Sequence, residues 1–408
     1  MDFFNVVSTE EARRIMIENF KDYEFQKEYV NLLDSIDRIL AVDIYSSIDV
    51  PEFDRSTVDG YAIVAQDSHG ATESIPSVLN ILGEVKMGEM TDKKIESSEA
   101  LYIPTGGMLP QGANGVIMIE NTESLDKDTL LLHKPISNGE NIIFKGDDIK
   151  KDDIALKRGR KITPECVGVL AALGISKVEV YKKPGFYIIS TGDEVIDLDE
   201  ELTMGKIRDI NTYSTFALIH KLGGMVVGRN IIKDNYELLR DEVEKALEIS
   251  DIVLLSGGSS VGTRDYTSKV IDSFNGNGVM VHGLSIKPGK PTIIGEGNGK
   301  LIIGLPGHPV SSIVVFKAIV EKYIEEKLGV INLSPRVNAI MDFNFPSSPG
   351  KETYQMVKLG EEDGKFHAVP TFGKSGMISL LSQSHGYIIM KPHEEGIYKG
   401  EEREVFLL

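Results

Sequence analysis

The feature that most constrains this chain is a regular alternation of strand-like and helical segments between Pro184 and Leu328. Short apolar runs predict strands, and the amphipathic patterns between them predict helices. We expect strands at Phe186–Ser190, Met225–Ile232, Ile252–Leu255, Val279–His282, Thr292–Ile294 and Leu301–Gly304, and helices at Thr212–Leu222, Asn235–Ile249 and Val310–Leu328. Strands and helices that alternate in this way predict a mostly parallel sheet with helices on both faces.

A glycine- and serine-rich loop follows one of these strands, in the sequence DIVLLSGGSSVGTRDY of Asp251–Tyr266. Ligands of open α/β sheets bind at the carboxyl ends of strands, where glycine lets a ligand approach the main chain. The loop has neither the lysine of a Walker motif nor the dinucleotide pattern GxGxxG. Its amides and hydroxyls therefore predict a phosphate site of another kind, with a simple tight turn as the alternative. The residues concerned are Ser256, Gly257, Gly258, Ser259, Ser260 and Gly262.

Polar, glycine-rich segments follow other strands as well, namely STGDE at 190–194 and GLPGHP at 304–309, which includes Pro306 and Gly307. The polar pair KD follows another strand at 233–234. Loops at one sheet edge converge, so together they predict a pocket. The carboxylates of Glu194, Asp234 and Asp265 would lie at its rim. Three such groups suit Mg²⁺, although each could instead cap a helix.

Two lysines, Lys287 and Lys290, lie in the segment KPGKP, which two prolines stiffen. Lysines held in this way can bind phosphate as point charges, and a surface turn is the alternative. His282 and His308 are near the predicted pocket but have no zinc-ligand spacing, so we expect them to form hydrogen bonds only.

A different pattern fills Ile48–Pro135, where short strand-like pieces alternate with turn residues and predict a small β unit. One polar segment, FDRSTVDGYA, contains Arg55, Ser56 and Asp59, and another, IPTGG, contains Thr105. The first cluster could orient an oxyanion and supply an acid or a base. A solvated turn is the alternative for the first segment, and the second is a weak signal by itself.

Helical patterns flank this β unit at Ser8–Phe20, at Tyr29–Leu40 and at Gly159–Leu173. We expect the third helix to return and pack on the first two, so that the β unit is inserted into a helical domain. After Ser334-Pro335 the pattern predicts strands again, and hence a second β domain at the C-terminus.

Composition excludes several classes of protein. The formal net charge is −18, whereas a nucleic-acid surface needs clustered Lys and Arg, so we expect no nucleic-acid partner. No apolar run is long enough to cross a membrane, and no signal peptide is visible. The single cysteine, Cys166, excludes an internal disulfide and fits a cytoplasmic location, and its helical context predicts a buried structural thiol.

The succession of motifs DRSTVDGYA, IPTGG, STGDE, SGGSSVG, KPGKP and GLPGHPVS resembles the molybdopterin molybdenumtransferases, that is, MoeA and the E domain of gephyrin. The resemblance runs from about Asp49 to the C-terminus. It implies an α/β multidomain fold with a central doubly wound, mostly parallel sheet of the MogA type. The domains would be a helical scaffold (1–47 and 136–182), an inserted small β domain (48–135), the α/β molybdopterin-binding domain (183–330) and a C-terminal β-barrel (331–408).

The same resemblance implies a reaction, insertion of molybdate into adenylylated molybdopterin with Mg²⁺-dependent hydrolysis and release of AMP. It also implies a homodimer whose active cleft lies between the inserted β domain of one subunit and the α/β and C-terminal domains of the other. Molybdopterin adenylyltransferase and downstream molybdoenzymes are further implied partners. By motif, the functional positions are Asp59, Thr105, Asp148, Glu194, Asp234 and Asp265, with Glu194 and Asp265 on the cation, and Ser256–Gly262 with Lys287 on phosphate or pterin.

The implied oxyanion site, Arg55, Ser56, Lys351 and Ser375, departs from the family pattern near the C-terminus. Lys351 and Met356 stand where arginines are common, Lys374 replaces a glycine, and a lysine lacks the bidentate fork that suits molybdate oxygens. Tungstate is therefore an alternative substrate. A molybdopterin adenylyltransferase, a catalytically silent gephyrin-like scaffold and a generic kinase are rival functions. The flanking β domains argue against the adenylyltransferase, and the retained carboxylates argue against the silent scaffold. The missing phosphate-binding lysine loop argues against the kinase.

Overall fold

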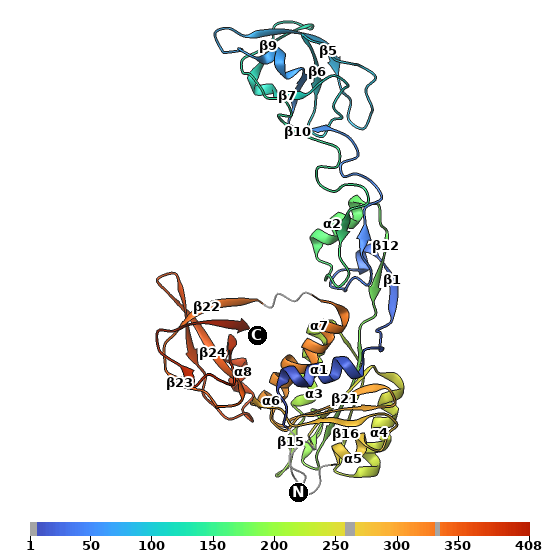
Figure 1. The fold of residues 1–408 in the computed structure, drawn as a ribbon, viewed down its shortest axis with the longest axis vertical. Coiled ribbons are helices and arrows are strands. Elements are labelled where there is room, and N and C mark those ends of the chain that lie inside the picture. The colour runs from blue at the N-terminus through green and yellow to red at the C-terminus, as the bar shows by residue number, and fades with distance from the viewer. Residues whose placement is uncertain (1–5, 258–265, 331–334) are drawn as a thin grey trace.

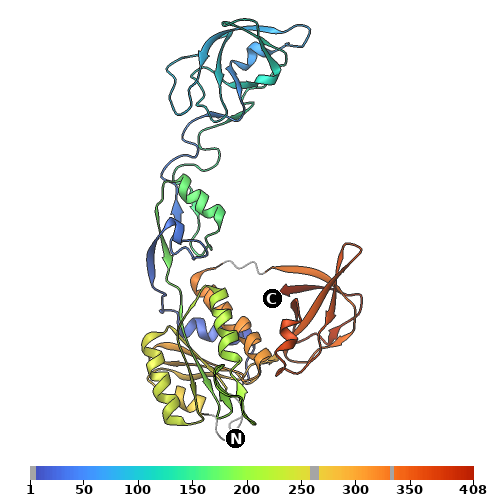
Figure 2. The ribbon, with the colours of Figure 1, turned by 180° about the vertical axis from the view of Figure 1, so that it is seen from behind.

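The computed structural model describes residues 6–257, 266–330 and 335–408, and it shows an elongated molecule with four parts (Figure 1). An inserted β domain lies at one end and an α/β domain at the other, with a small domain between them. The C-terminal β domain packs beside the α/β domain. The view from behind shows the same arrangement (Figure 2). Among the described residues, no helix is long and apolar enough to cross a membrane.

The α/β domain is built on a six-stranded sheet in the order β16-β13-β17-β21-β20-β18. The first four strands run parallel, and β20 and β18 are antiparallel to their neighbours. The bounds are β13 Gly185–Thr191, β16 Met225–Ile232, β17 Ile252–Ser256, β18 Gly278–His282, β20 Ile293–Gly297 and β21 Lys300–Leu305. The predicted mostly parallel sheet is confirmed, with every expected strand present.

Helices cover both faces of this sheet, as the doubly wound pattern predicts. Along β21, Leu301 and Ile303 face one apolar cluster and Ile302 faces the other, because side chains alternate along a strand. On the first face lie α3 (Asn211–Leu222), α6 (Pro309–Val315), the π-helical turn η4 (Phe316–Glu321) and α7 (Lys322–Leu328). On the second lie α4 (Tyr236–Ile249) and α5 (Thr267–Ile271).

The inserted domain is a six-stranded sheet in the order β7-β4-β6-β5-β9-β8. Its strands are β4 Gly60–Ile63, β5 Ser77–Glu84, β6 Glu99–Ile103, β7 Gly115–Met118, β8 Thr122–Ser124 and β9 Thr129–Leu132. Two apolar clusters fill it, one around Ile63 and Ile117 and the other around Leu101 and Val116. Short strands β3 (Arg55–Ser56) and β10 (Ile142–Ile143) pair where the chain enters and leaves the domain.

The small domain is less helical than the sequence predicts. The expected helix at Tyr29–Leu40 is wrong, because this segment begins with strand β1 (Lys27–Asn31) and the single turn η1 (Leu32–Asp34). Strand β1 pairs with β12 (Lys177–Tyr181). Tyr29 and Glu179, which lie opposite each other in this pair, are 150 residues apart in the chain, so local periodicity cannot show the pairing. Strands β2 (Ile44–Tyr45) and β11 (Ile154–Leu156) form a second pair.

Helix α2 (Pro164–Ala172) covers these strands and buries Cys166 and Leu170 in their core, so the prediction of a buried thiol is confirmed. Helix α1 (Thr9–Asn19) does not join α2. It packs instead on η4 and α7 of the α/β domain, where Met16 is fully buried and Arg13 donates a hydrogen bond to the Ala318 carbonyl (3.1 Å).

The C-terminal domain is a closed barrel of five strands, β22-β25-β24-β26-β28, in which β28 pairs back to β22. The bounds are β22 Arg336–Met341, β24 Glu352–Glu362, β25 Lys365–Pro370, β26 Gly386–Met390 and β28 Glu402–Leu407, with the short helix α8 at Ser379–Ser382. Strand β19 (Ile286–Lys287), from the α/β part of the chain, adds to this sheet beside β24. The expected β-barrel is confirmed.

Candidate active site

Three strands of the α/β sheet end in register at one edge. Ser190 of β13 lies opposite Ser256 of β17, and Ser256 lies opposite Leu305 of β21. The segments STGDE, Ser256-Gly257 and GLPGHP therefore leave the sheet side by side, as the sequence predicts. Gly257 has a φ of +100°, and a Cβ there would lie 2.5 Å from the Thr191 carbonyl oxygen, so only glycine fits between these loops.

Asn211, at the start of α3, ties two of these loops together. Its Nδ2 donates hydrogen bonds to Ser256 Oγ and to the Gly307 carbonyl, both at 2.8 Å, and the side chain is buried. Sequence analysis did not single out this residue. The only signal available was its place at a helix start beside the predicted pocket.

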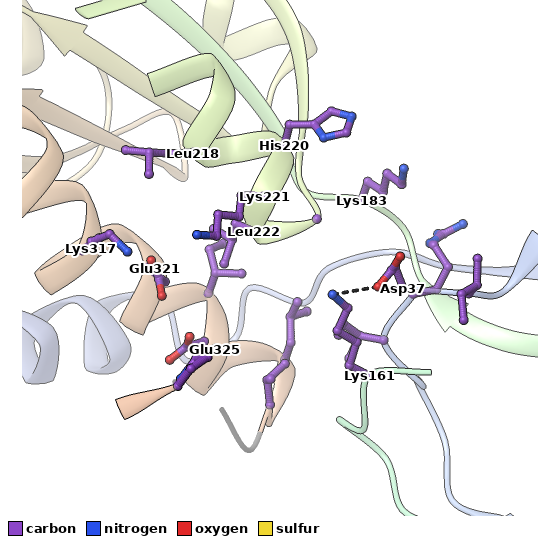
Figure 3. A pocket seen from close by; sticks show the side chains of 18 of the residues that line it. Asp37, Lys161, Lys183, Leu218, His220, Lys221, Leu222, Lys317, Glu321 and Glu325 are labelled. Atoms are coloured by element: carbon purple, nitrogen blue, oxygen red, sulfur yellow. Dashed lines mark ion pairs between the residues drawn. The ribbon is translucent and has the colours of Figure 1, made fainter. Parts of the chain in front are cut away.

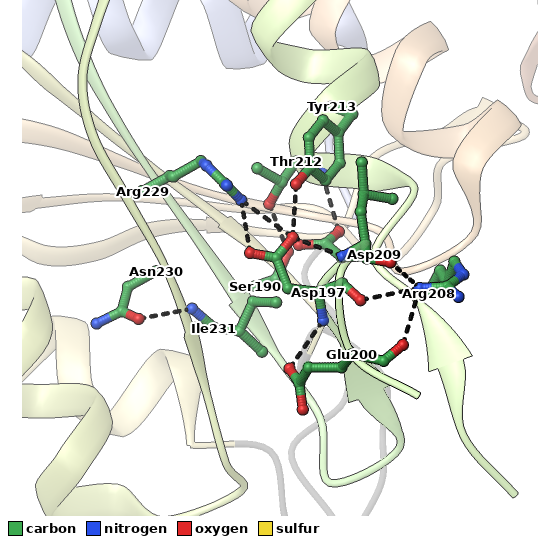
Figure 4. Close-up of polar contacts among 11 residues, drawn as sticks. Ser190, Asp197, Glu200, Arg208, Asp209, Thr212, Tyr213, Arg229, Asn230 and Ile231 are labelled. Carbon is green, nitrogen blue, oxygen red and sulfur yellow. Dashed lines mark hydrogen bonds and ion pairs between the residues drawn. The ribbon is translucent and has the colours of Figure 1, made fainter. Parts of the chain in front are cut away.

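Buried acceptors without a partner surround the same edge. Among the described residues, Thr191 Oγ1, Asp209 Oδ2 and Asn211 Oδ1 are buried and have no hydrogen-bond partner. The other oxygen of Asp209 accepts the Thr212 N–H in the first turn of α3 at 3.0 Å, and Thr212 in turn pairs with Ser190 at 2.9 Å (Figure 4). An unpaired buried polar atom costs roughly 1–3 kcal/mol. Such atoms at the edge of a predicted pocket are typical of a site built to bind a polar molecule.

The acidic rim lies at the ends of β13 and β16. Glu194 is exposed and its carboxylate folds beside Gly192, while the Asp193 carboxylate accepts the Asp234 N–H at 3.3 Å. Among the described residues, no three His, Cys, Asp or Glu side chains are grouped to hold a metal ion. Glu194 and Asp234 follow the neighbouring strands β13 and β16, and carboxylate oxygens are ligands of the kind that Mg²⁺ takes together with substrate and water.

A cluster around Asp197 lies beside this rim (Figure 4). Tyr213 donates a hydrogen bond to Asp197 at 2.5 Å, and Arg229 lies 3.3 Å from the same carboxylate and 5.0 Å from the Tyr213 ring centroid. The Tyr213 hydrogen bond, with help from Arg229, lowers the pKa of Asp197. Asp197 and Arg229 line a small hollow of about 330 Å³, and their contacts with Tyr213 hold the loop that follows Glu194.

The C-terminal barrel supplies a second wall. Lys287 donates a hydrogen bond from Nζ to Ser348 Oγ at 2.7 Å, in the turn that also contains Lys351. His308 Nδ1 lies 2.7 Å from Ser375 Oγ, and the Val310 N–H bonds the Ser375 carbonyl at 3.1 Å. The structure therefore brings Lys287, Lys351, Ser375 and Pro306-Gly307 to the contact between two domains. The Lys290 carbonyl accepts the N–H groups of Leu284 and Thr292 and shapes the turn between Lys287 and the sheet.

The two polar segments of the inserted domain meet each other. Asp59 accepts the Thr105 N–H at 2.9 Å, and Ser56 exchanges backbone hydrogen bonds with Gly106 and Gly107. Arg55 is exposed beside them, and Asp148 is exposed in the turn where the chain leaves the domain. Sequence reasoning identified both segments but had no means of pairing them.

The two walls lie far apart within one chain. Figures 1 and 2 agree that the inserted domain is at the opposite end of the molecule from the α/β sheet, beyond the small domain. Asp59, Thr105, Arg55, Ser56 and Asp148 therefore do not reach the sheet edge in a single chain. The remaining predicted residues, Gly258, Ser259, Ser260, Gly262 and Asp265, lie outside the described residues.

Comparison with known proteins gives consistent results over the whole length. Three family models match in succession: the MoeA N-terminal region (domain I and II) over residues 7–174, the "Probable molybdopterin binding domain" over 187–326, and the MoeA C-terminal region (domain IV) over 338–408.

Individual relatives cover nearly all of the chain. A molybdopterin molybdenumtransferase of Staphylococcus aureus is 32% identical over 93% of this chain and 90% of its own. Two crystal structures of the molybdopterin biosynthesis protein MoeA from Pyrococcus horikoshii are similar, one at 32% identity with a TM-score of 0.85 over 99% of this chain and 100% of the other. The second is 36% identical, with a TM-score of 0.79 over 99% of each chain.

Proposed function

The chain belongs to the MoeA family of molybdopterin molybdenumtransferases, enzymes of molybdenum cofactor biosynthesis, and from this premise we propose its reaction in detail. It would insert molybdate into adenylylated molybdopterin, with hydrolysis of the pyrophosphate bond and release of AMP. The observation that carries the proposal is the sheet edge, where Ser256, Gly257, Gly307 and buried acceptors converge opposite a wall containing Lys287 and Ser375.

At this edge, the phosphates of the substrate would bind the main chain of Ser256 and Gly257 and the ammonium group of Lys287. Molybdate oxygens would lie nearer the barrel, where Lys351 and the hydroxyls of Ser348 and Ser375 offer donors. The unpaired acceptors Asp209 Oδ2 and Asn211 Oδ1 suit N–H donors of a pterin. Hydrogen bonds such as Asn211 to Ser256 keep these groups fixed, which favours catalysis by orientation.

Glu194 and Asp234, with Asp265 from outside the described residues, would hold a divalent cation such as Mg²⁺. When bound, the cation would neutralise charge on the pyrophosphate and favour departure of AMP. The donor chemistry of the acidic rim supports this role.

The catalytic cleft would be completed by a second copy of the chain. Asp59 and Thr105 form a rigid polar group, yet their own α/β domain is out of reach. A two-fold dimer could place this group against the partner's sheet edge, and both clefts would then be equivalent.

Reconstitution with purified components tests the reaction. The protein is mixed with adenylylated molybdopterin, Mg²⁺ and either molybdate or tungstate, and AMP release is followed for each oxyanion. We expect release that depends on both the cation and the oxyanion, with molybdate preferred. In a parallel mixture with ATP and molybdopterin, adenylylation without metal insertion would contradict the proposal. A preference for tungstate in the first mixture would reassign the oxyanion.

A further inference from the structure

A second cavity lies at the other edge of the α/β domain, where three domains meet (Figure 3). It has a volume of about 620 Å³, within the range of sites that hold an organic small molecule. Its walls come from the last turns of α3 and α7, from the small domain at Asp37 and Lys161, and from the barrel at Tyr387. The catalytic edge is at the opposite ends of the same strands, so the two sites are distinct.

The cavity combines an apolar lining with basic groups. Leu218, Leu222, Ile324 and Leu328 supply apolar surface, and Tyr387 adds an aromatic ring. Five lysines or arginines line it against three acids, although the whole chain has a net charge of −18. Asp37 pairs with Lys161 and Glu325 pairs with Lys322, each at 2.8 Å, and Arg38 pairs with Glu28. The basic character of the cavity therefore rests on Lys183, Lys221 and Lys317 against Glu321.

Two of the lysines face one another across the space. Figure 3 shows Lys317 of η4 and Lys221 of α3 with their ammonium groups directed toward the same region. Within the described part of the chain, no hydrogen bond or ion pair engages the side chain of Lys183, Lys221 or Lys317. Lys317 is half-buried and lies 5.8 Å from the centre of the Tyr387 ring. Glu321 lies between them in this view and interacts with both, so two positive charges face one negative charge and a second anion would be favourable there.

The backbone under Lys317 is also unusual. It lies in a π-helical turn between two α-helical segments, and such turns are rare and frequent at functional sites. Burial lowers the pKa of Lys317 and raises the pKa of Glu321 in the same turn. Glu321 favours the charged form of Lys317, and an anion bound between the lysines would favour it further.

We propose that this junction pocket binds an organic phosphate the size of a nucleotide, with its planar apolar body against Tyr387 and the leucines and its phosphates between Lys317 and Lys221. Lys183 would extend the basic rim toward the small domain. The ligand would touch three domains at once and would therefore stabilise their arrangement. The proposal rests on the cavity alone and does not depend on the catalytic function.

Isothermal titration calorimetry with ADP tests the site. The titrations use full-length protein carrying Lys287→Ala, which weakens phosphate binding at the catalytic edge. We expect ADP to bind with a Kd below about 1 mM. Adenosine and inorganic pyrophosphate should each bind at least about tenfold more weakly, because adenosine lacks the phosphates and pyrophosphate lacks the planar apolar body. Equal affinity for pyrophosphate and ADP would contradict the apolar half of the site.

Substitutions locate the binding. In the same background, Lys221→Glu and Lys317→Met should each weaken ADP binding at least about tenfold, while Lys127→Glu, at an exposed turn of the inserted domain, should change nothing. If Lys317→Met fails to fold, Lys221→Glu and Lys183→Glu, at exposed side chains, test the location of ADP binding in its place. Unchanged ADP affinity in folded pocket variants, or loss of all binding in the Lys287→Ala background, would overturn the proposal.

Discussion

At the scale of single residues, Asn211 shows what a sequence can and cannot reveal. Ser256 and Gly307 could be identified from the sequence because each follows a predicted strand in a polar, glycine-rich loop. Asn211 follows no such pattern, and its importance comes from two hydrogen bonds to residues 45 and 96 positions away. Side-chain contacts over such separations depend on the completed fold, so the sequence alone could not predict them.

Replacing Asn211 with Ala should damage catalysis more than stability. The change removes the donor that holds Ser256 and Gly307, so their loops would shift, and we expect AMP release to fall by roughly 10- to 100-fold. The unfolding free energy should fall by only about 1–3 kcal/mol. Asn138→Ala, in an exposed turn, is the matched control. An Asn211→Ala enzyme with normal turnover would show that the two loops need no such link.

Glycine at position 257 gives a second test at this scale. Gly257 and Gly299 both have positive φ, +100° and +77°, so an added methyl group strains both backbones. Only at Gly257 would the new Cβ collide with a neighbour, the Thr191 carbonyl oxygen at 2.5 Å, whereas nothing lies within 4 Å at Gly299. Gly257→Ala should therefore reduce AMP release strongly and Gly299→Ala should not. Equal losses of AMP release in the two variants would mean that backbone strain alone causes the effect.

At the scale of helices and strands, the sequence predicted the α/β domain well and the small domain poorly. In the α/β domain each strand and its covering helix are near in sequence, so apolar periodicity and capping residues were sufficient. In the small domain, β1 pairs with β12 across the whole inserted domain. The spacing of Val30, Leu33, Ile36 and Leu40 is that of a helix, but Val30 and Leu40 pack into an apolar core formed by segments that are distant in the chain.

Helix α1 provides the prediction for this scale. Met16 is fully buried between α1 and the helices of the α/β domain, so Met16→Ala should leave a cavity there. We expect the unfolding transition of that domain to lose roughly 2–5 kcal/mol in a denaturant titration. Met90→Ala, at a side chain that is 72% exposed, should have almost no effect. Equal stability of the two variants would mean that α1 contributes little to the domain.

At the scale of the whole molecule, the predicted site residues that the structure describes fall into two groups at opposite ends of an elongated chain (Figure 1). The sequence indicated both groups and the family resemblance implied that a dimer joins them. The structure shows why a single chain cannot do so, because the small domain separates them. Our central claim is therefore that each catalytic cleft combines Asp59 of one subunit with Lys287 and Ser256 of its partner.

Mixing two inactive variants tests this claim most directly. Asp59→Asn and Lys287→Ala subunits are unfolded together, refolded as a mixture and assayed for AMP release. Random pairing makes half of the dimers mixed, and each mixed dimer has one cleft free of both substitutions. The account predicts recovery of about a quarter of the wild-type activity, with each variant inactive when refolded alone. A mixture as inactive as its separate components, with mixed dimers demonstrated by mass spectrometry, would contradict it.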